Sequence, residues 1–353
     1  MIVKKILSLA ASTIKLFIII LLFSSNSKSE EKNIKYYSDD RGILSLMYHR
    51  FDENKYPSTN IQMDVFKKQI QIIKNLKYNF YDPENLEKNF HIPKIEKEIL
   101  ITIDDAFSSF YEVAWPYFKK EKIPFILFVS TKSVGRNGYM TWNQIKELEK
   151  ENTVYIGNHS HTHGYLVSLK NEELISDINT SSSIFKEKLG YNPIFFSYPF
   201  GEYSSFLKKY ISKNFRFSFG QHSGVIDINK DRHELPRFPI NEKYGDLKRF
   251  EFLINLYPLQ YKVLYPVEKY LKDNNNPPKF EVEFFNEQKN IKNINCFSDE
   301  VDGWEKSNID FNQTTLNLNF RGKYNFRRGR VNCSLNDNGI WRWFGVQFSV
   351  KQN

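Results

Sequence analysis

A chain of 353 residues in which 41% are hydrophobic is long and apolar enough to fill the core of one large domain or two. Its net charge of +9 is spread along the sequence, without a dense Lys/Arg tract or a nucleic-acid-binding motif, so nucleic acid is excluded as a partner. Aromatic residues reach 16%, which suits a sugar-binding surface but follows equally well from an AT-rich genome.

The first 29 residues have the layout of a secretory signal. Lys4 and Lys5 precede an apolar stretch that is strongest at 16–23, and a small polar segment follows at 24–29. Lys15 interrupts the apolar run and leaves it too short to span a bilayer. We therefore expect an exported protein, periplasmic or extracellular. An uncleaved N-terminal anchor is the alternative, and membrane association would occur only through this segment.

Residues 30–42 are polar and resemble a linker, and from residue 43 strand-like and helix-like segments alternate. Strands are predicted at 43–49, 99–103, 125–129, 154–156 and 194–198, and helices at 65–76, 110–120, 142–150, 172–189 and 204–214. This alternation is typical of an α/β fold with a parallel sheet. With six or seven such units, a (β/α) barrel over 43–245 is favoured over an open sheet.

The pattern changes near 274–278, after a connector at 246–275 to which we assign no structure. Short alternating runs at 280–284, 291–296, 315–320, 330–333 and 341–350 then predict a small all-β, sandwich-like domain over 276–353. Trp341 and Trp343 share one strand face, and we expect them in the sandwich core rather than on a sugar-stacking surface. Cys296 and Cys333 both lie here, and in an exported chain such a pair favours a disulfide.

Acidic and imidazole side chains stand where predicted strands end. Asp104 and Asp105 directly follow one strand, the run His-Ser-His-Thr-His at 159–163 follows another, and His49 ends the first. Because reactive groups collect at the carboxyl ends of the strands of a parallel barrel, we expect these side chains to share one rim. One carboxylate and two imidazoles suit a divalent cation, which leaves the second carboxylate free to act as a base.

These motifs resemble those of the polysaccharide deacetylases of the NodB-homology group, carbohydrate esterase family 4. Residues 101–105 are similar to the family's Thr-Phe-Asp-Asp motif, and residues 159–163 match its His-Ser/Thr-x-x-His motif. Residues 197–201 resemble its Arg-x-Pro-Tyr/Phe-Gly motif, and the run at 46–50 looks like the branch that includes the poly-N-acetylglucosamine deacetylases. The resemblance covers residues 43–245 and implies a distorted, NodB-type, TIM-like barrel.

The resemblance also implies a role for each matching residue. Asp105, His159 and His163 would hold a divalent metal, with Zn²⁺ as the expected ion. Asp104 would be the general base for a metal-bound water that attacks the acetamide carbonyl. A backbone N–H near Phe200 would stabilise the oxyanion.

The sequence departs from the family pattern in its third motif, because Ser197 stands where the family has an arginine that orients the base. We expect Arg237 to supply that guanidinium from another strand and to lie among the substrate-binding residues. The other residues predicted to contact substrate are His49, Pro199 and Phe200.

The late Leu-x-x-His motif, which supplies the family's general acid, is also missing. His222 is the predicted substitute and His233 the second choice. His161, in the middle of the histidine run, should point away from its neighbours and serve in packing.

The implied function is metal-dependent removal of N-acetyl groups from an acetylated amino-sugar polysaccharide, an amide hydrolysis. An O-acetyl esterase acting on a polysaccharide such as xylan is the first alternative, since an alkoxide leaves more easily than an amine and needs less help from an acid. A non-catalytic glycan-binding protein is the second. The intact set of two acids and two histidines argues against it. The C-terminal domain would bind glycan or help to orient the barrel.

Overall fold

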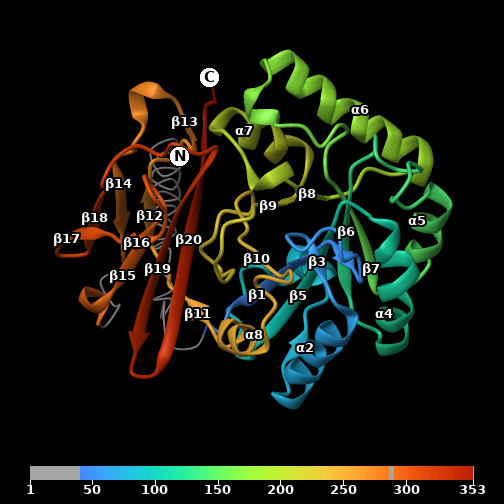
Figure 1. The fold of residues 1–353 in the computed structure, drawn as a ribbon, viewed down its shortest axis with the longest axis horizontal. Coiled ribbons are helices and arrows are strands. Elements are labelled where there is room, and N and C mark those ends of the chain that lie inside the picture. The colour runs from blue at the N-terminus through green and yellow to red at the C-terminus, as the bar shows by residue number, and fades with distance from the viewer. Residues whose placement is uncertain (1–39, 286–289, 353) are drawn as a thin grey trace, which may run out of the picture. The chain divides into compact units, whose positions relative to one another are not determined.

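The computed structural model describes residues 40–285 and 290–352, so the predicted signal segment lies outside the described residues. An eight-stranded parallel sheet forms the first part of the fold, in the order β10-β1-β5-β6-β7-β8-β9, with β4 also paired to β5 (Figure 1). The strands are β1 (Ile43–Tyr48), β4 (Asn79–Phe80), β5 (Glu98–Asp104), β6 (Phe125–Val129), β7 (Val154–Asn158), β8 (Phe195–Ser197), β9 (Phe217–Phe219) and β10 (Phe238–Pro239).

The sheet is curled. A bridge between Phe219 and Leu235 joins β9 to the segment that leads into β10, and β10 pairs with β1. Every residue of β6 is buried, as expected for a parallel strand that is covered on both faces. The predicted α/β barrel of the NodB type is therefore confirmed as a curled parallel sheet with helices between its strands.

Six helices connect these strands: α2 (Met63–Asn75), α3 (Glu84–Asn89), α4 (Trp115–Glu121), α5 (Trp142–Glu149), α6 (Asn171–Leu189) and α7 (Ser205–Asn214). Helix α2 buries Phe66, Ile70 and Ile73 along one face, the spacing of an amphipathic helix. The helix predicted at 110–120 is a π-helical turn, Phe110–Ala114, followed by α4. Pro116 lies in the first turn of α4, directly after this π-helical turn.

The C-terminal part is all-β and contains two sheets. One is ordered β11-β20-β19-β15-β16, with β13 also on β20, and the other is ordered β12-β14-β18-β17. The strands are β11 (Tyr257–Pro258), β12 (Val263–Tyr265), β13 (Tyr270–Leu271), β14 (Phe280–Glu283), β15 (Asn295–Ser298), β16 (Glu305–Lys306), β17 (Asn308–Asn312), β18 (Thr315–Asn319), β19 (Arg328–Asp337) and β20 (Ile340–Val350). A short parallel pair, β2 (Arg50–Phe51) and β3 (Asn60–Ile61), and helix α8 (Leu247–Ile254) complete the set described here.

One apolar core is shared by the two C-terminal sheets. Val282 and Leu316 of one sheet and Val346 of the other belong to it, together with Cys296 and Cys333. The two cysteines form a disulfide between the paired strands β15 and β19, which confirms the expected bond.

The C-terminal part differs from the expectation in three places. Strands β11 and β13, from the connector at 246–275, pair with β20, so the all-β region begins before residue 276. The run predicted as a strand at 291–296 opens with a 3-10 turn at Ile291–Asn293. Trp341 and Trp343 are not in the sandwich core, because Phe344 and Val346, on the opposite face of β20, fill it. Trp343 packs instead against the barrel core.

Candidate active site

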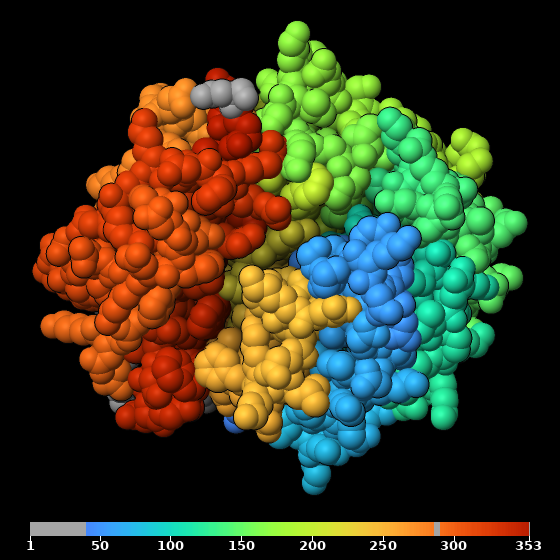
Figure 2. Space-filling model, viewed as in Figure 1, coloured from blue at the N-terminus to red at the C-terminus, as the bar shows by residue number. Residues whose placement is uncertain are grey.

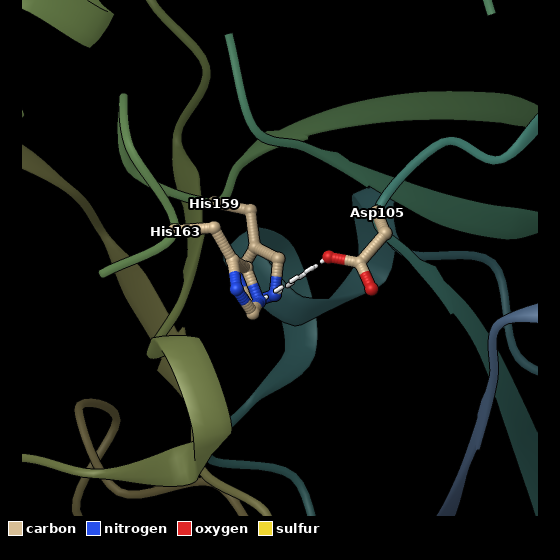
Figure 3. A group of neighbouring side chains, drawn as sticks. All are labelled: Asp105, His159 and His163. Carbon is tan, nitrogen blue, oxygen red and sulfur yellow. Dashed lines mark ion pairs between the residues drawn. The ribbon is translucent and has the colours of Figure 1, made fainter. Parts of the chain in front are cut away.

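Three side chains from two strand ends converge at the carboxyl edge of the parallel sheet (Figure 3). Asp105 follows β5, and His159 and His163 follow β7. Asp105 Oδ1 lies 3.2 Å from His163 Nε2 and 3.7 Å from His159 Nε2. One ligand atom from each of the three residues lies within 4.8 Å of the others, a spacing that suits a single divalent cation. The structure thus brings together the three residues predicted as metal ligands.

The protonation of His159 also fits a metal ligand. Its Nδ1 lies 2.7 Å from the carbonyl oxygen of Ser197, so that nitrogen carries the proton and Nε2 keeps its lone pair. His159 is fully buried, and its Nε2 has no hydrogen-bond partner among the described residues. Burial lowers the pKa of this imidazole to about 4, although Asp104 opposes the shift. Burying an imidazole nitrogen without a hydrogen-bond partner costs free energy, and a cation bound to this nitrogen would remove that cost.

Tight turns at the strand ends present these ligands. Asp105 and Ala106 have φ values of 73° and 54°, and His163 has a φ of 54°, all in the left-handed region. Asp177 of α6 holds the histidine loop, because its carboxylate accepts hydrogen bonds from the backbone N–H groups of His161 and Thr162. Asp177 was not predicted as a site residue, because a single aspartate on a helix carries no motif.

Asp104 is paired with Arg237, 133 residues further along the chain. The guanidinium donates to both carboxylate oxygens, at 2.6 and 2.9 Å, and both side chains are fully buried. Burial by itself raises the pKa of Asp104, but Arg237, helped by His159 and His49, outweighs it and holds the pKa at about 2. Asp104 is therefore an ionised acceptor at neutral pH.

Ser197 supports this pairing from the position where the family motif has arginine. Arg237 Nη2 donates to Ser197 Oγ at 2.7 Å, and its Nε donates to the carbonyl oxygen of Gly220 at 2.9 Å. Arg237 is fully buried and hydrogen-bonded to Asp104, where the guanidinium missing at Ser197 was expected, and its predicted contact with substrate stays a prediction.

His49 lies beside the same carboxylate. Its Nε2 is 4.0 Å from Asp104 Oδ2, and its side chain is 14% exposed, so it faces the rim. Burial lowers the pKa of His49, and Asp104 and Asp105 act in the opposite direction. The sequence analysis predicted it to contact substrate.

The other histidines face elsewhere. The ring of His222 is buried, its pKa is lowered to about 4 by that burial, and the charges acting on it are those of Glu234, Lys230 and Lys269. His233 Nδ1 lies 2.9 Å from Ser218 Oγ. His161 Nδ1 lies 2.9 Å from Thr131 Oγ1, outside the group that could hold a metal.

The loop after β8 forms the remaining wall. Pro199, Phe200 and Gly201 make a 3-10 turn in which Phe200 has a φ of 59°. The edge of the Phe200 ring meets His163, with ring centres 4.7 Å apart, and its face stacks on Tyr165 at 4.4 Å. No sequence motif had indicated Tyr165.

Comparison with known proteins points to the polysaccharide deacetylases. Residues 91–216 match the family model of the polysaccharide deacetylases. The protein YxkH of Bacillus subtilis is 26% identical over 161 residues, which are 45% of this chain and 57% of YxkH, so the chain spans little more than half of that relative. The poly-β-1,6-N-acetyl-D-glucosamine N-deacetylase of Staphylococcus aureus is 22% identical over 242 residues, 60% of this chain and 82% of the relative.

Solved structures show the same fold. IcaB from Ammonifex degensii superposes with a TM-score of 0.54 at 24% identity, over 61% of this chain and 98% of that one. The deacetylase PplD of Streptococcus pyogenes superposes with a TM-score of 0.54 at 22% identity, over 60% of this chain and 98% of PplD. Both likenesses therefore leave more than a third of this chain without a counterpart. The curled sheet that carries the Asp/His/His group accordingly contains a polysaccharide deacetylase domain, over the residues 91–216 that match the family model.

Proposed function

We propose that the protein removes N-acetyl groups from an amino-sugar polysaccharide and uses one divalent cation, Zn²⁺, held by Asp105, His159 and His163. The observation that carries the proposal is the convergence of these three ligands beside an ionised, arginine-paired Asp104. When bound, the cation would lower the pKa of a water molecule that it ligates and polarise the acetyl carbonyl. The buried Nε2 of His159, which has no hydrogen-bond partner among the described residues, supports the presence of this cation.

The chain's own groups then handle the protons. Asp104 takes the proton of the attacking water as oxygen bonds to the acetyl carbon, and Arg237 keeps the carboxylate oriented toward that water. The carbon–nitrogen bond breaks, and the amine needs a proton as it leaves. His49 is 4.0 Å from Asp104 and lies on the rim, so we place the donor there. A backbone N–H near Phe200 would stabilise the oxyanion.

The predicted role of His222 as general acid stays a prediction, and its surroundings favour His49. The charges that act on His222 are those of Glu234, Lys230 and Lys269, whereas Asp104 and Asp105 act on His49, opposed by Arg237 and His163. A donor next to the base also favours amide over ester hydrolysis, because an amine leaving group depends on protonation more strongly than an alkoxide.

The substrate class follows from the relatives. One curated relative is named as a poly-β-1,6-N-acetyl-D-glucosamine N-deacetylase, and we propose an acetylated polymer of this chemistry as the substrate. The buried disulfide in the C-terminal part supports export to the periplasm or the extracellular space, because disulfides persist in oxidising compartments.

The test is acetate release by the purified protein of residues 30–353 from β-1,6-linked N-acetylglucosamine oligomers, with O-acetylated xylan assayed in parallel. We expect release from the amino-sugar oligomers and loss of roughly two orders of magnitude or more in Asp104→Asn, the range that a general base contributes. Release from xylan alone would identify an esterase. No release from either substrate would contradict the proposal.

A further inference from the structure

The C-terminal all-β region reaches the loop that carries Phe200. Gln347 of β20 donates a hydrogen bond from Nε2 to the carbonyl oxygen of Phe200 at 2.9 Å. Gln347 is only 3% exposed, so water competes little for this bond. The space-filling view shows residues of this region, in orange and red, against residues of the barrel (Figure 2).

Arg327, which directly precedes β19, contacts the same loop at Glu202. Its Nε lies 3.1 and 3.2 Å from the two carboxylate oxygens of Glu202, and Arg328 adds a second guanidinium at 3.9 Å. Glu202 is 2% exposed, and a buried carboxylate requires a cationic or hydrogen-bonding partner. The all-β region supplies that partner.

Arg327 also caps a stack of rings that ends at a metal ligand. Its guanidinium carbon lies 3.3 Å from the centre of the Tyr165 ring, whose other face stacks on Phe200. Phe200 in turn meets His163 edge-on. Both faces of Tyr165 are thus occupied, although 43% of the residue is exposed.

Phe200 has a reason to need such support. Its φ of 59° is unfavourable for a residue with a side chain and persists only where surrounding contacts enforce it. The contacts that reach this turn include Gln347 of β20, Arg327 just before β19, and the rings of Tyr165 and His163.

We propose that Gln347 and Arg327 are positioning residues, through which the all-β region holds the Phe200 turn in the conformation that the active site requires. The expected effect on kcat rests on the proposed deacetylation, whereas the expected effect on the conformation of the Phe200 turn does not. Neither residue contacts the reacting atoms, so their loss should lower kcat more than it changes KM.

The first variant is Gln347→Glu, which keeps the size of the side chain but replaces the amide donor with an acceptor facing the Phe200 carbonyl. The second is Arg327→Ala, accompanied by Arg327→Lys, which keeps a charge for Glu202 but removes the planar group over Tyr165. Arg321→Ala is the matched control, because Arg321 pairs with Glu300 inside the all-β region at 3.1 Å. Its hydrogen bonds go to Ser298, Glu300 and Gly303.

Two quantities are measured on the purified protein of residues 30–353. Hydrogen exchange of the backbone amides at 200–204 should accelerate at least tenfold in Gln347→Glu and Arg327→Ala, to a smaller extent in Arg327→Lys, and less than twofold in Arg321→Ala. With N-acetylglucosamine oligomers, kcat should fall at least tenfold in the first two variants while KM stays within twofold.

Unchanged exchange and kcat in Gln347→Glu and Arg327→Ala would overturn the proposal. Equal losses in Arg321→Ala would also overturn it, because they would reflect stability alone. If the wild-type protein releases no acetate, the proposed function fails, and the exchange rates at 200–204 still decide whether the all-β region positions the turn.

Discussion

At the scale of single residues, the site depends on one buried ion pair. Arg237 and Asp104 are both fully buried and share two hydrogen bonds, while Ser197 and Gly220 take further guanidinium donors. A pair of this kind contributes little net stability, but removal of one partner leaves an uncompensated charge that costs about 3–5 kcal/mol. Its value is that Asp104 stays ionised and held in one orientation.

We predict that Arg237→Lys lowers kcat/KM for acetate release roughly 10- to 100-fold, because an ammonium offers no bidentate fork to the carboxylate. Steady-state kinetics with N-acetylglucosamine oligomers measure this. Arg232→Lys is the control, since Arg232 lies over the ring of Phe90, away from the site. A full rate in Arg237→Lys would show that Arg237 does not orient the base.

His222 gives a prediction about pH. Burial lowers its folded-state pKa to about 4 from an unfolded value near 6.5, so the unfolded state binds more protons between these values. Its contribution to stability is therefore complete above pH 6.5 and is lost as the pH falls toward 4, by on the order of 3 kcal/mol. We expect the free energy of unfolding in urea to depend less on pH between 4 and 6.5 in His222→Asn than in the wild-type protein.

The same variant separates the two candidate acids. With His49 as the donor, His222→Asn should keep acetate release at pH 7 within a few-fold of wild type. A loss of roughly 100-fold or more, with the fold intact by circular dichroism, would return the role to His222.

At the scale of elements, strand ends build the site, and the strands themselves could be predicted. Runs such as 99–103 and 125–129 are apolar except for Thr102 because both faces of the sheet are covered, which is a local signal. Which face of β20 packs into the sandwich core, and therefore where Trp341 lies, could not be predicted from such a local signal. Alternation along β20 defines two faces, but the barrel on one side and the sandwich core on the other are both apolar partners.

The residues that support the site show the same limit. Arg237 was found only because an arginine was missing from the motif at Ser197. Nothing in the local sequence marks Gln347 or Arg327, which lie 147 and 125 residues from their partners Phe200 and Glu202. Contacts at such separations depend on how the C-terminal strands meet the barrel.

The disulfide between β15 and β19 yields a prediction at this scale. It closes a loop with a sequence separation of 37 residues, so the chain-entropy model gives a stabilisation of about 3–4 kcal/mol. The double variant Cys296→Ala/Cys333→Ala should lose about this much in urea unfolding. Dithiothreitol should destabilise the wild type and leave the double variant unaffected. Equal stability of the two proteins would contradict this expectation.

At the scale of the whole molecule, the described residues from 40 onward belong to one compact unit, in which the barrel and the all-β region are in direct contact. Gly224, in the loop after β9, bridges to Phe344 of β20, and Trp343 donates to Ser223 at 2.9 Å. The two parts therefore meet along the segment between β9 and β10. The all-β region is thus positioned to act on the site as well as to fold beside it.

The proposed chemistry requires that Asp105, His159 and His163 hold one catalytic cation. The most direct test is to remove metal from the protein with a chelator, add Zn²⁺ stepwise, and follow bound zinc and acetate release from β-1,6-linked N-acetylglucosamine oligomers together. We predict no release before addition and full recovery at one zinc per chain, with neither tight binding nor recovery in Asp105→Asn. Full activity without metal, or unchanged zinc binding and activity in Asp105→Asn, would contradict the account.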